Sequence, residues 1–157
     1  MSVTIPVTLD RDFSVDCTAE QAYELLADVP RSASYFPDVE ELKDMGGGTY
    51  EWVMEKVGIG KLSVQTLYAS LYTCNPDDKT VSWEPVPDIG NAKVSGYWQI
   101  ADAGDGHVNL SLHAESEFDL PIPRLAKAVT KPILEREFGK LMDQYVDNLR
   151  DTMNTLH

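Results

Sequence analysis

The N-terminal part of the chain shows a strand pattern followed by a helix signal. Residues 3–17 alternate between apolar and polar side chains almost without exception, which is typical of a long strand with one buried face. Thr18 and Gln21 have the spacing of a capping box, so a helix is predicted to begin there. Pro30 is expected to end this helix, and residues 32–36 are expected to add one short helical turn.

From residue 39 onwards, short apolar runs alternate with turn residues. The turn signals are the three glycines at 46–48, the segment 58–60 and the sequence NPDD at 75–78. Residues 85–91 include two prolines and are expected to form a loop. Short connections between consecutive strands favour an antiparallel meander. The strands are predicted over residues 39–45, 49–57, 61–73, 80–84, 92–101 and 108–118.

The last third of the chain has the period of a helix. From Leu125 to Leu156, apolar residues recur at steps of three and four, which places nearly all of them on one stripe. A helix over residues 123–155 would be about 50 Å long at ~1.5 Å per residue. Pro132 lies inside this pattern and predicts a kink or a restart. Gly139 has two interpretations: it lets helix and sheet approach closely, or it leaves space for a ligand.

These elements predict an α+β fold. One strand, two short helices, about six further strands and a long C-terminal helix form a β-α-α-β6-α order, with a curved antiparallel sheet of about seven strands. The apolar face of such a sheet needs a cover, and the terminal helix is the natural one. No linker or internal repeat divides the sequence, so residues 1–157 are expected to form a single domain.

Composition narrows the choice of partners. The formal net charge of −13 argues against nucleic acid as a partner, because phosphates attract a basic surface. It also argues against docking on anionic membranes. No signal peptide pattern opens the chain, no run approaches the ~20 apolar residues of a membrane span, and no apolar tail ends it. A cytoplasmic protein without stable membrane insertion is therefore expected.

Cysteines and histidines give no sign of a metal site. Cys17 and Cys74 are isolated in the sequence and are expected to be buried, reduced thiols. Neither they nor His107, His113 and His157 have the spacing of metal ligands. No metal and no cofactor is therefore expected.

Five short stretches carry a resemblance to a known family. They are TAEQAYELLAD at 18–28, YFP at 35–37, VSWE at 81–84, LPIP at 120–123 and YVDNL at 145–149. Together they resemble the START-like (SRPBCC) helix-grip superfamily, and most closely its polyketide cyclase/dehydratase and lipid-transport branch. That branch includes a type associated with carbon monoxide dehydrogenase and a coenzyme-Q-binding type. The resemblance implies a curved sheet that grips the terminal helix, with a cavity for an apolar ligand between them.

The predicted inner faces combine apolar side chains with a few hydroxyl groups. One face of segment 61–73 includes Thr66, Tyr68, Ser70 and Tyr72, which suits a pocket with polar handles. The alternative is that these tyrosines place their hydroxyls at the sheet margin. The inner face of 49–57 also stays open, with Tyr50, Trp52 and Met54 on one side and Val53 and Val57 on the other. The candidate cavity residues are Trp52, Met54, Tyr68, Tyr72, Trp83, Trp98, Leu112, Ser116, Phe118, Leu125, Val129, Ile133, Phe138 and Met142. The candidate mouth consists of residues 35–37, 85–91 and 120–124.

Three functions remain open from the sequence. No phosphate loop or nucleophile elbow is present. Alternation places His113, Glu115 and Glu117 on the outer face of their strand. An enzyme would then have Tyr68, Tyr72 and Tyr145 as its inward titratable groups, which are weak bases at neutral pH. The leading hypothesis is a non-catalytic binder of a lipid, quinone, isoprenoid or polyketide. The alternatives are an aromatic polyketide cyclase or dehydratase, which requires a charged group or histidine in the cavity, and an assembly or maturation factor with a protein partner.

Overall fold

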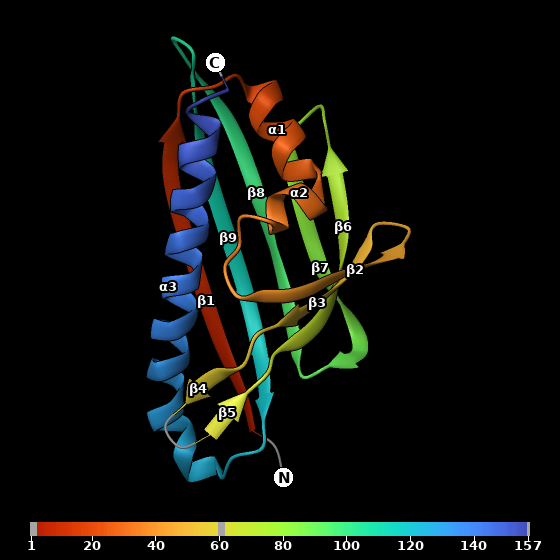
Figure 1. The fold of residues 1–157 in the computed structure, drawn as a ribbon, viewed down its shortest axis with the longest axis vertical. Coiled ribbons are helices and arrows are strands. Elements are labelled where there is room, and N and C mark those ends of the chain that lie inside the picture. Colours follow the sequence, from red (N-terminus) through yellow and green to blue (C-terminus); the bar gives the residue numbers. More distant parts are fainter. Residues whose placement is uncertain (1–2, 60–61, 157) are drawn as a thin grey trace.

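The computed structural model describes residues 3–59 and 62–156, and it has the predicted α+β helix-grip fold (Figure 1). A long curved sheet carries α3 along one side of its concave face and α1 and α2 over the other end. The elements are β1 (Val3–Val15), α1 (Ala19–Ala27), α2 (Val29–Ala33), β2 (Val39–Gly46), β3 (Thr49–Met54), β4 (Val57–Ile59), β5 (Leu62–Val64), β6 (Leu67–Asn75), β7 (Thr80–Gly90), β8 (Ala92–Gly104), β9 (His107–Leu120), the 3₁₀ turn η1 (Arg124–Ala126) and α3 (Lys127–Met153).

The main sheet has seven strands in the order β1-β9-β8-β7-β6-β3-β2, and every pairing is antiparallel. The predicted meander is therefore confirmed. β1 closes the sheet against β9 in unbroken register, from the pair Val3 and Leu120 to the pair Val15 and Val108. Alternate residues of both strands are buried on the concave face, so β1 and β9 form the floor beneath α3.

Two of the predicted strands are each interrupted. Segment 49–57 breaks at residues 55–56 and segment 61–73 breaks at 65–66, and between the breaks β4 and β5 form a separate two-stranded hairpin. The expected turn at 58–60 is wrong for Gly58, which lies in β4, and Gly60 lies outside the described residues. The sequence pattern therefore does not show which residues of these two segments pair in the main sheet and which pair in the separate hairpin.

The capping box is confirmed, but Pro30 has a different role from the predicted one. Thr18 Oγ1 accepts from the Gln21 N–H at 3.1 Å, and Gln21 Oε1 accepts from the Thr18 N–H at 3.0 Å. α1 already ends at Ala27, and Asp28 caps α2. Pro30 lies in the first turn of α2, where its missing N–H leaves no bond unmade. It begins the second helix rather than ending the first.

Residues 85–90, expected in a loop, belong to β7, so that prediction is wrong. β7 pairs with β8 only over residues 80–83, and beyond this point its open edge tolerates proline. The end of β7 is fixed by Gly90, whose φ is +76° and where a Cβ would lie 1.9 Å from the Leu67 carbonyl oxygen. Asn91 completes the connection, because its Oδ1 accepts from the Leu67 N–H at 3.0 Å.

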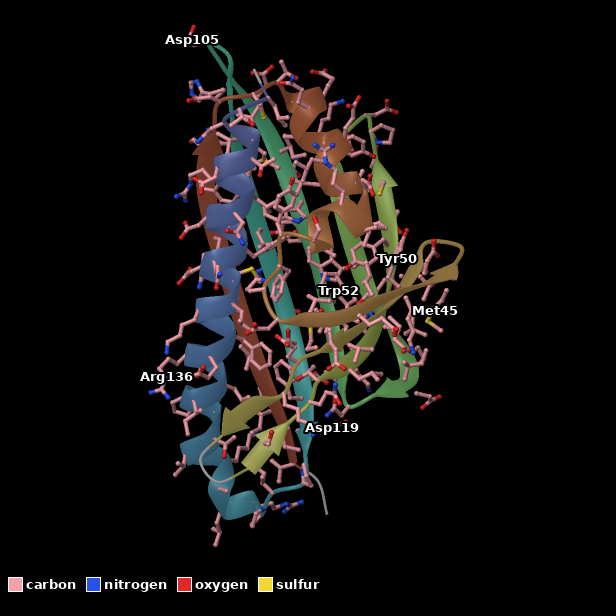
Figure 2. The ribbon with its side chains drawn as sticks, in the orientation of Figure 1. Met45, Tyr50, Trp52, Asp105, Asp119 and Arg136 are labelled. Carbon is pink, nitrogen blue, oxygen red and sulfur yellow. The ribbon has the colours of Figure 1, made fainter. Side chains whose placement is uncertain are left out.

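The terminal helix packs against β1. α3 has 27 residues, about 40 Å at ~1.5 Å per residue, and continues through Pro132 as one helix, so of the expected kink or restart the restart is wrong. Arg11 of β1 donates from Nε to Asp143 at 2.6 Å and from Nη2 to the Gly139 carbonyl at 3.3 Å. Gly139 thus faces the Arg11 side chain, which supports close helix–sheet approach over space for a ligand. On the outer side of α3, Arg136 points away from the sheet (Figure 2).

None of the helices in the described part of the chain is long and apolar enough to cross a membrane.

The two cysteines differ in environment. Cys17 is buried in the main core cluster, as expected, whereas Cys74 is exposed. Cys74 follows Tyr72 on the same face of β6, but it lies close to the end of the strand, where the end of α1 covers the sheet only in part. Its Sγ is 3.9 Å from the Ala27 carbonyl oxygen of α1. The expectation of two buried thiols is therefore wrong for Cys74.

Candidate ligand-binding cavity

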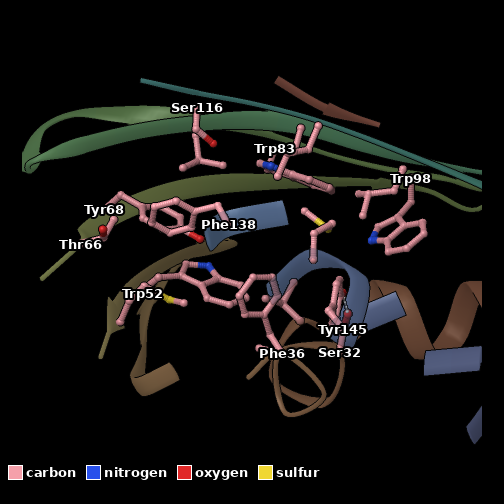
Figure 3. Close-up of a pocket in the computed structure, with 18 of the residues that line it drawn as sticks. Ser32, Phe36, Trp52, Thr66, Tyr68, Trp83, Trp98, Ser116, Phe138 and Tyr145 are labelled. Carbon is pink, nitrogen blue, oxygen red and sulfur yellow. Dashed lines mark hydrogen bonds between the residues drawn. The ribbon is translucent and has the colours of Figure 1, made fainter. Parts of the chain in front are cut away.

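A hollow of about 100 Å³ lies between the concave face of the sheet and α3 (Figure 3). α1, α2 and the segment that follows them close it on the remaining side. The lining residues are Val7, Leu9, Leu26, Val29, Ser32, Ala33, Phe36, Trp52, Met54, Thr66, Tyr68, Tyr72, Val81, Trp83, Val94, Trp98, Leu112, Ala114, Ser116, Phe118, Phe138, Met142 and Tyr145.

Most of the sequence-predicted cavity residues meet at this hollow. The open choice of face in segment 49–57 is settled, since Trp52 and Met54 are buried and line the hollow. Tyr145, named as a titratable group, is also there. The predicted residues that line it are Trp52, Met54, Tyr68, Tyr72, Trp83, Trp98, Leu112, Ser116, Phe118, Phe138 and Met142.

Three predicted residues do not line the hollow. Leu125 is 95% exposed and Val129 is 67% exposed, and Ile133 packs at the edge of the cluster around Ile5 and Leu134. The inward stripe of α3 runs through Thr130, Leu134 and Phe138. Val129 and Ile133 each precede a stripe residue by one position and are rotated about 100° from it. The three-four spacing of apolar residues in the sequence did not distinguish the inward stripe of α3 from the neighbouring stripe that includes Val129 and Ile133.

The sequence missed the contribution of the short helices. Leu26, Val29, Ser32 and Ala33 line the hollow from α1 and α2, and nothing in the sequence indicated what these residues face. Of the candidate mouth segments, only 35–37 contributes, through Phe36.

Phe36 and Ala33 separate the hollow from the surface. Both also line a second, more open hollow of about 310 Å³ between α2, β2 and β3, together with Glu40, Glu41 and Tyr50 among others. A side chain that lines two adjacent hollows forms the wall between them. Movement of the Phe36 ring would therefore join the hollow to the surface.

Nine of the lining residues are aromatic. Trp52 and Tyr68 stack with 5.9 Å between centroids and 10° between planes, and Phe36 meets Trp52 edge-on at 6.0 Å. Across the hollow, Phe118 of the sheet stacks on Phe138 of α3 at 4.7 Å. Such pairs add about 0.5–1.5 kcal/mol each beyond the area they bury, so the wall is held in place without a ligand.

Some polar groups of the lining bond to each other and others do not. Trp52 Nε1 donates to Tyr72 Oη at 3.1 Å, and the Ser32 and Tyr145 hydroxyls share a hydrogen bond. Figure 3 places Ser32, Tyr145 and Trp98 at one end, and Trp52, Thr66 and Tyr68 at the other. Among the described residues, the side-chain hydroxyls of Thr66, Tyr68 and Ser116 have no hydrogen-bond partner. These three hydroxyls are available to a ligand.

Burial keeps the cavity tyrosines protonated. Desolvation raises the pKa of Tyr145 to about 12 and raises the pKa values of Tyr68 and Tyr72 well above that of an exposed tyrosine. At neutral pH these hydroxyls act as hydrogen-bond donors and acceptors, not as bases.

None of the described residues that line the hollow is charged or a histidine. His113, as expected, faces the outer side, where it bonds to Asp10.

Gly96 is required for the position of Trp83. A Cβ at Gly96 would lie 2.2 Å from the His113 carbonyl oxygen and 2.8 Å from Trp83 Cζ2. We expect Gly96→Ala to lower the free energy of unfolding by about 1–3 kcal/mol, because strand and indole must both shift. Urea unfolding would measure this loss, with Ser95→Ala on the same strand as the control. Equal stability of the two variants would contradict the packing of Trp83 over β8.

Comparisons with known proteins support the same family as the sequence motifs. A family model described as polyketide cyclase / dehydrase and lipid transport matches residues 6–154. The search of curated proteins found no match.

Solved structures share the fold at low sequence identity. An aromatase/cyclase from Streptomyces sp. R1128 superposes with a TM-score of 0.70 at 15% identity, covering 94% of this chain and 93% of that chain. A START superfamily protein from Mycobacterium smegmatis gives 0.69 at 13% identity, covering 96% and 99%. A Thalictrum flavum norcoclaurine synthase point mutant, in complex with a transition-state analogue, gives 0.60 at 11% identity, covering 96% of each chain. Because the family model spans nearly the whole sequence, the chain belongs to the polyketide cyclase / dehydrase and lipid transport family.

Proposed function

We propose that this protein binds an uncharged, largely apolar small molecule in the hollow between the sheet and α3. The observation that carries the proposal is the chemistry of the lining: mostly aromatic and aliphatic side chains, no charged side chain among the described lining residues, and the hydroxyls of Thr66, Tyr68 and Ser116, which make no hydrogen bond to other described residues. An apolar ring system would bury its surface against the rings, and the hydroxyls of Thr66, Tyr68 and Ser116 would bond its oxygen atoms.

The size of the hollow limits what it holds without rearrangement. At about 100 Å³ it is smaller than the engineered cavity of about 150 Å³ that binds benzene. A quinone, isoprenoid, lipid or polyketide therefore requires the wall to move. Phe36 separates the hollow from its open neighbour, and Met54 and Met142 have flexible side chains that can repack. A ligand that loses about 300 Å² of exposed surface would gain several kcal/mol at ~25 cal/mol per Å², enough for micromolar binding after association costs.

Polyketide cyclisation is the second candidate, and the family match and the aromatase/cyclase neighbour favour it. Such a reaction needs a group that accepts or donates a proton near neutral pH. The described lining offers only tyrosine and aliphatic hydroxyls, and burial makes the tyrosines still weaker acids. Binding without turnover therefore agrees better with the cavity.

A fluorescent apolar probe tests the proposal. We expect wild-type protein to bind it with blue-shifted emission and to release it to an excess of an apolar competitor. Tyr68→Phe removes one free hydroxyl and should weaken binding of a probe that carries a ketone about fivefold, the effect of one hydrogen bond. Tyr97→Phe, at an exposed tyrosine of β8, should leave it unchanged. No displaceable binding by wild-type protein would refute the proposal, and turnover of a polyketide substrate would favour the second candidate.

A further inference from the structure

One end of the molecule exposes apolar side chains that nothing in the described structure covers. It consists of η1 and the first turn of α3, residues 124–131, which we call the α3 tip. Leu125 and Val129 are the most exposed large apolar residues among those described, at 95% and 67%. Figure 1 shows this tip at the end of the molecule opposite α1, beside the β4–β5 hairpin.

The α3 tip is basic although the chain is strongly acidic. It carries Arg124, Lys127 and Lys131, and residues 121–134 include no aspartate or glutamate. The chain as a whole has a net charge of −13, so the residues outside this segment carry −16. Among the described residues, none of the three cations has an ion-pair partner.

These cations do not stabilise the helix that carries them. A helix has a positive N-terminus, which favours acidic side chains in its first turn and disfavours basic ones. α3 has no acidic residue in its first turn and no side-chain cap. Its C-terminal half carries Asp143, Asp147 and Asp151 against Lys140 and Arg150, so the basic residues of α3 are not concentrated at the end that its dipole favours. The basic tip is therefore better explained by an external anion than by helix stability.

We propose that the α3 tip docks on the surface of an anionic phospholipid bilayer. Leu125 and Val129 would enter the boundary between headgroups and acyl chains, and the three cations would bind the anionic headgroups. The net charge of −13 opposes approach to an anionic membrane, as the sequence indicates, but salt screens most of this repulsion. At 0.15 M salt the screening length is about 8 Å, and the first acidic residue of α3, Glu135, lies about 12 Å along the helix from Lys127 and about 6 Å from Lys131 at ~1.5 Å per residue.

The tip is also close to the hollow. β4 contacts α3, and the hairpin is flanked by Met54 and Thr66, which both line the hollow. Docking at this end would bring the proposed binding site near a source of apolar molecules. The docking itself does not depend on a bound ligand and can be measured without one.

Vesicle co-sedimentation at 0.15 M salt tests the proposal. We expect wild-type protein to bind vesicles of phosphatidylcholine with 30% phosphatidylglycerol, and to bind pure phosphatidylcholine at least tenfold more weakly. Arg124→Gln/Lys127→Gln/Lys131→Gln should lower the partition coefficient about a hundredfold, at about fivefold per cation. Leu125→Ser/Val129→Ser should lower it at least tenfold.

The control variant changes one apolar and one basic residue that are exposed elsewhere. Met45→Ser/Lys43→Gln, with both residues in β2, should bind vesicles like wild type. Met45 lies at the β2–β3 hairpin, on the opposite side of the molecule from α3 (Figure 2). Its loss therefore leaves the α3 tip intact.

Several results would overturn the proposal. They are no binding to anionic vesicles, equal binding to neutral ones, or wild-type binding by the tip variants. Self-association that the tip substitutions abolish, without vesicle binding, would show that the tip is an interface between copies of this chain. Arg124, Leu125, Lys127 and Val129 are exposed and Lys131 is only partly buried, so thermal unfolding should hardly change, and probe binding in the hollow should also be retained. A failure of membrane docking is thereby distinguished from a failure of the proposed binding function.

Discussion

Leu149→Ala is expected to lower the free energy of unfolding by about 3 kcal/mol, whereas Leu125→Ala is expected to change it by less than about 0.5 kcal/mol. Both leucines belong to the same predicted apolar stripe. Leu149 is fully buried in the cluster that joins α3 to α1 and the sheet, whereas Leu125 is 95% exposed. Removing three buried carbons loses their transfer free energy and leaves a cavity, and an exposed side chain loses neither contribution.

Urea unfolding of the two variants beside wild type measures this contrast directly. The slope of the unfolding free energy against urea should be the same in all three, because the surface exposed on unfolding hardly changes. Equal destabilisation by the two substitutions would mean that α3 does not bind the sheet through its C-terminal half.

Ser116→Leu is expected to lower the affinity for an apolar probe at least tenfold without lowering the melting temperature. Ser116 lies on the concave face of β9 between Val7 and Val94, and its side chain borders the hollow. A leucine there would occupy much of a space of about 100 Å³. It would also gain apolar contacts, because filling a cavity stabilises a protein rather than straining it.

Ser111→Leu is the matched control, since it makes the same substitution on the opposite face of the same strand. It should leave probe affinity within twofold of wild type. If Ser116→Leu binds the probe as wild type does, the probe site lies elsewhere. If it unfolds the protein, the hollow is smaller than the structure shows.

The strands and helices could be predicted from the sequence where one spacing of apolar residues continues along the whole element. Alternation in β1, β8 and β9 and the three-four spacing of α3 each bury one face, so pattern and packing agree. The errors arose where hydrogen bonding overrides the pattern. β4 and β5 leave the main sheet without a turn signal at the breaks, and β7 passes through Pro85 and Pro87 because its edge is open there.

The cavity was predictable on the strands and less so on the helices. A period of two leaves only two faces, so Trp52, Trp98 and Ser116 were placed once the concave face was assigned. The side chains of a helix point in many directions, and a stripe displaced by one residue can also consist of apolar residues. For this reason Leu125 and Val129 were wrongly assigned to the cavity, although both are exposed. The facing of α2 depends on long-range packing, so Ser32 gave no signal in the sequence.

Methionine methyl resonances test the central claim most directly, because two of the five methionines lie on opposite walls of the hollow. Met54 belongs to β3 and Met142 to α3, while Met45 is exposed and Met153 is buried outside the hollow. Protein labelled with ¹³C in the methionine methyl groups would be titrated with an apolar ligand and followed by NMR. We predict that the Met54 and Met142 signals shift together and saturate at one ligand per chain, while those of Met45 and Met153 stay in place. Binding that leaves Met54 and Met142 unmoved, or that shifts Met45 instead, would contradict a ligand site between the sheet and α3.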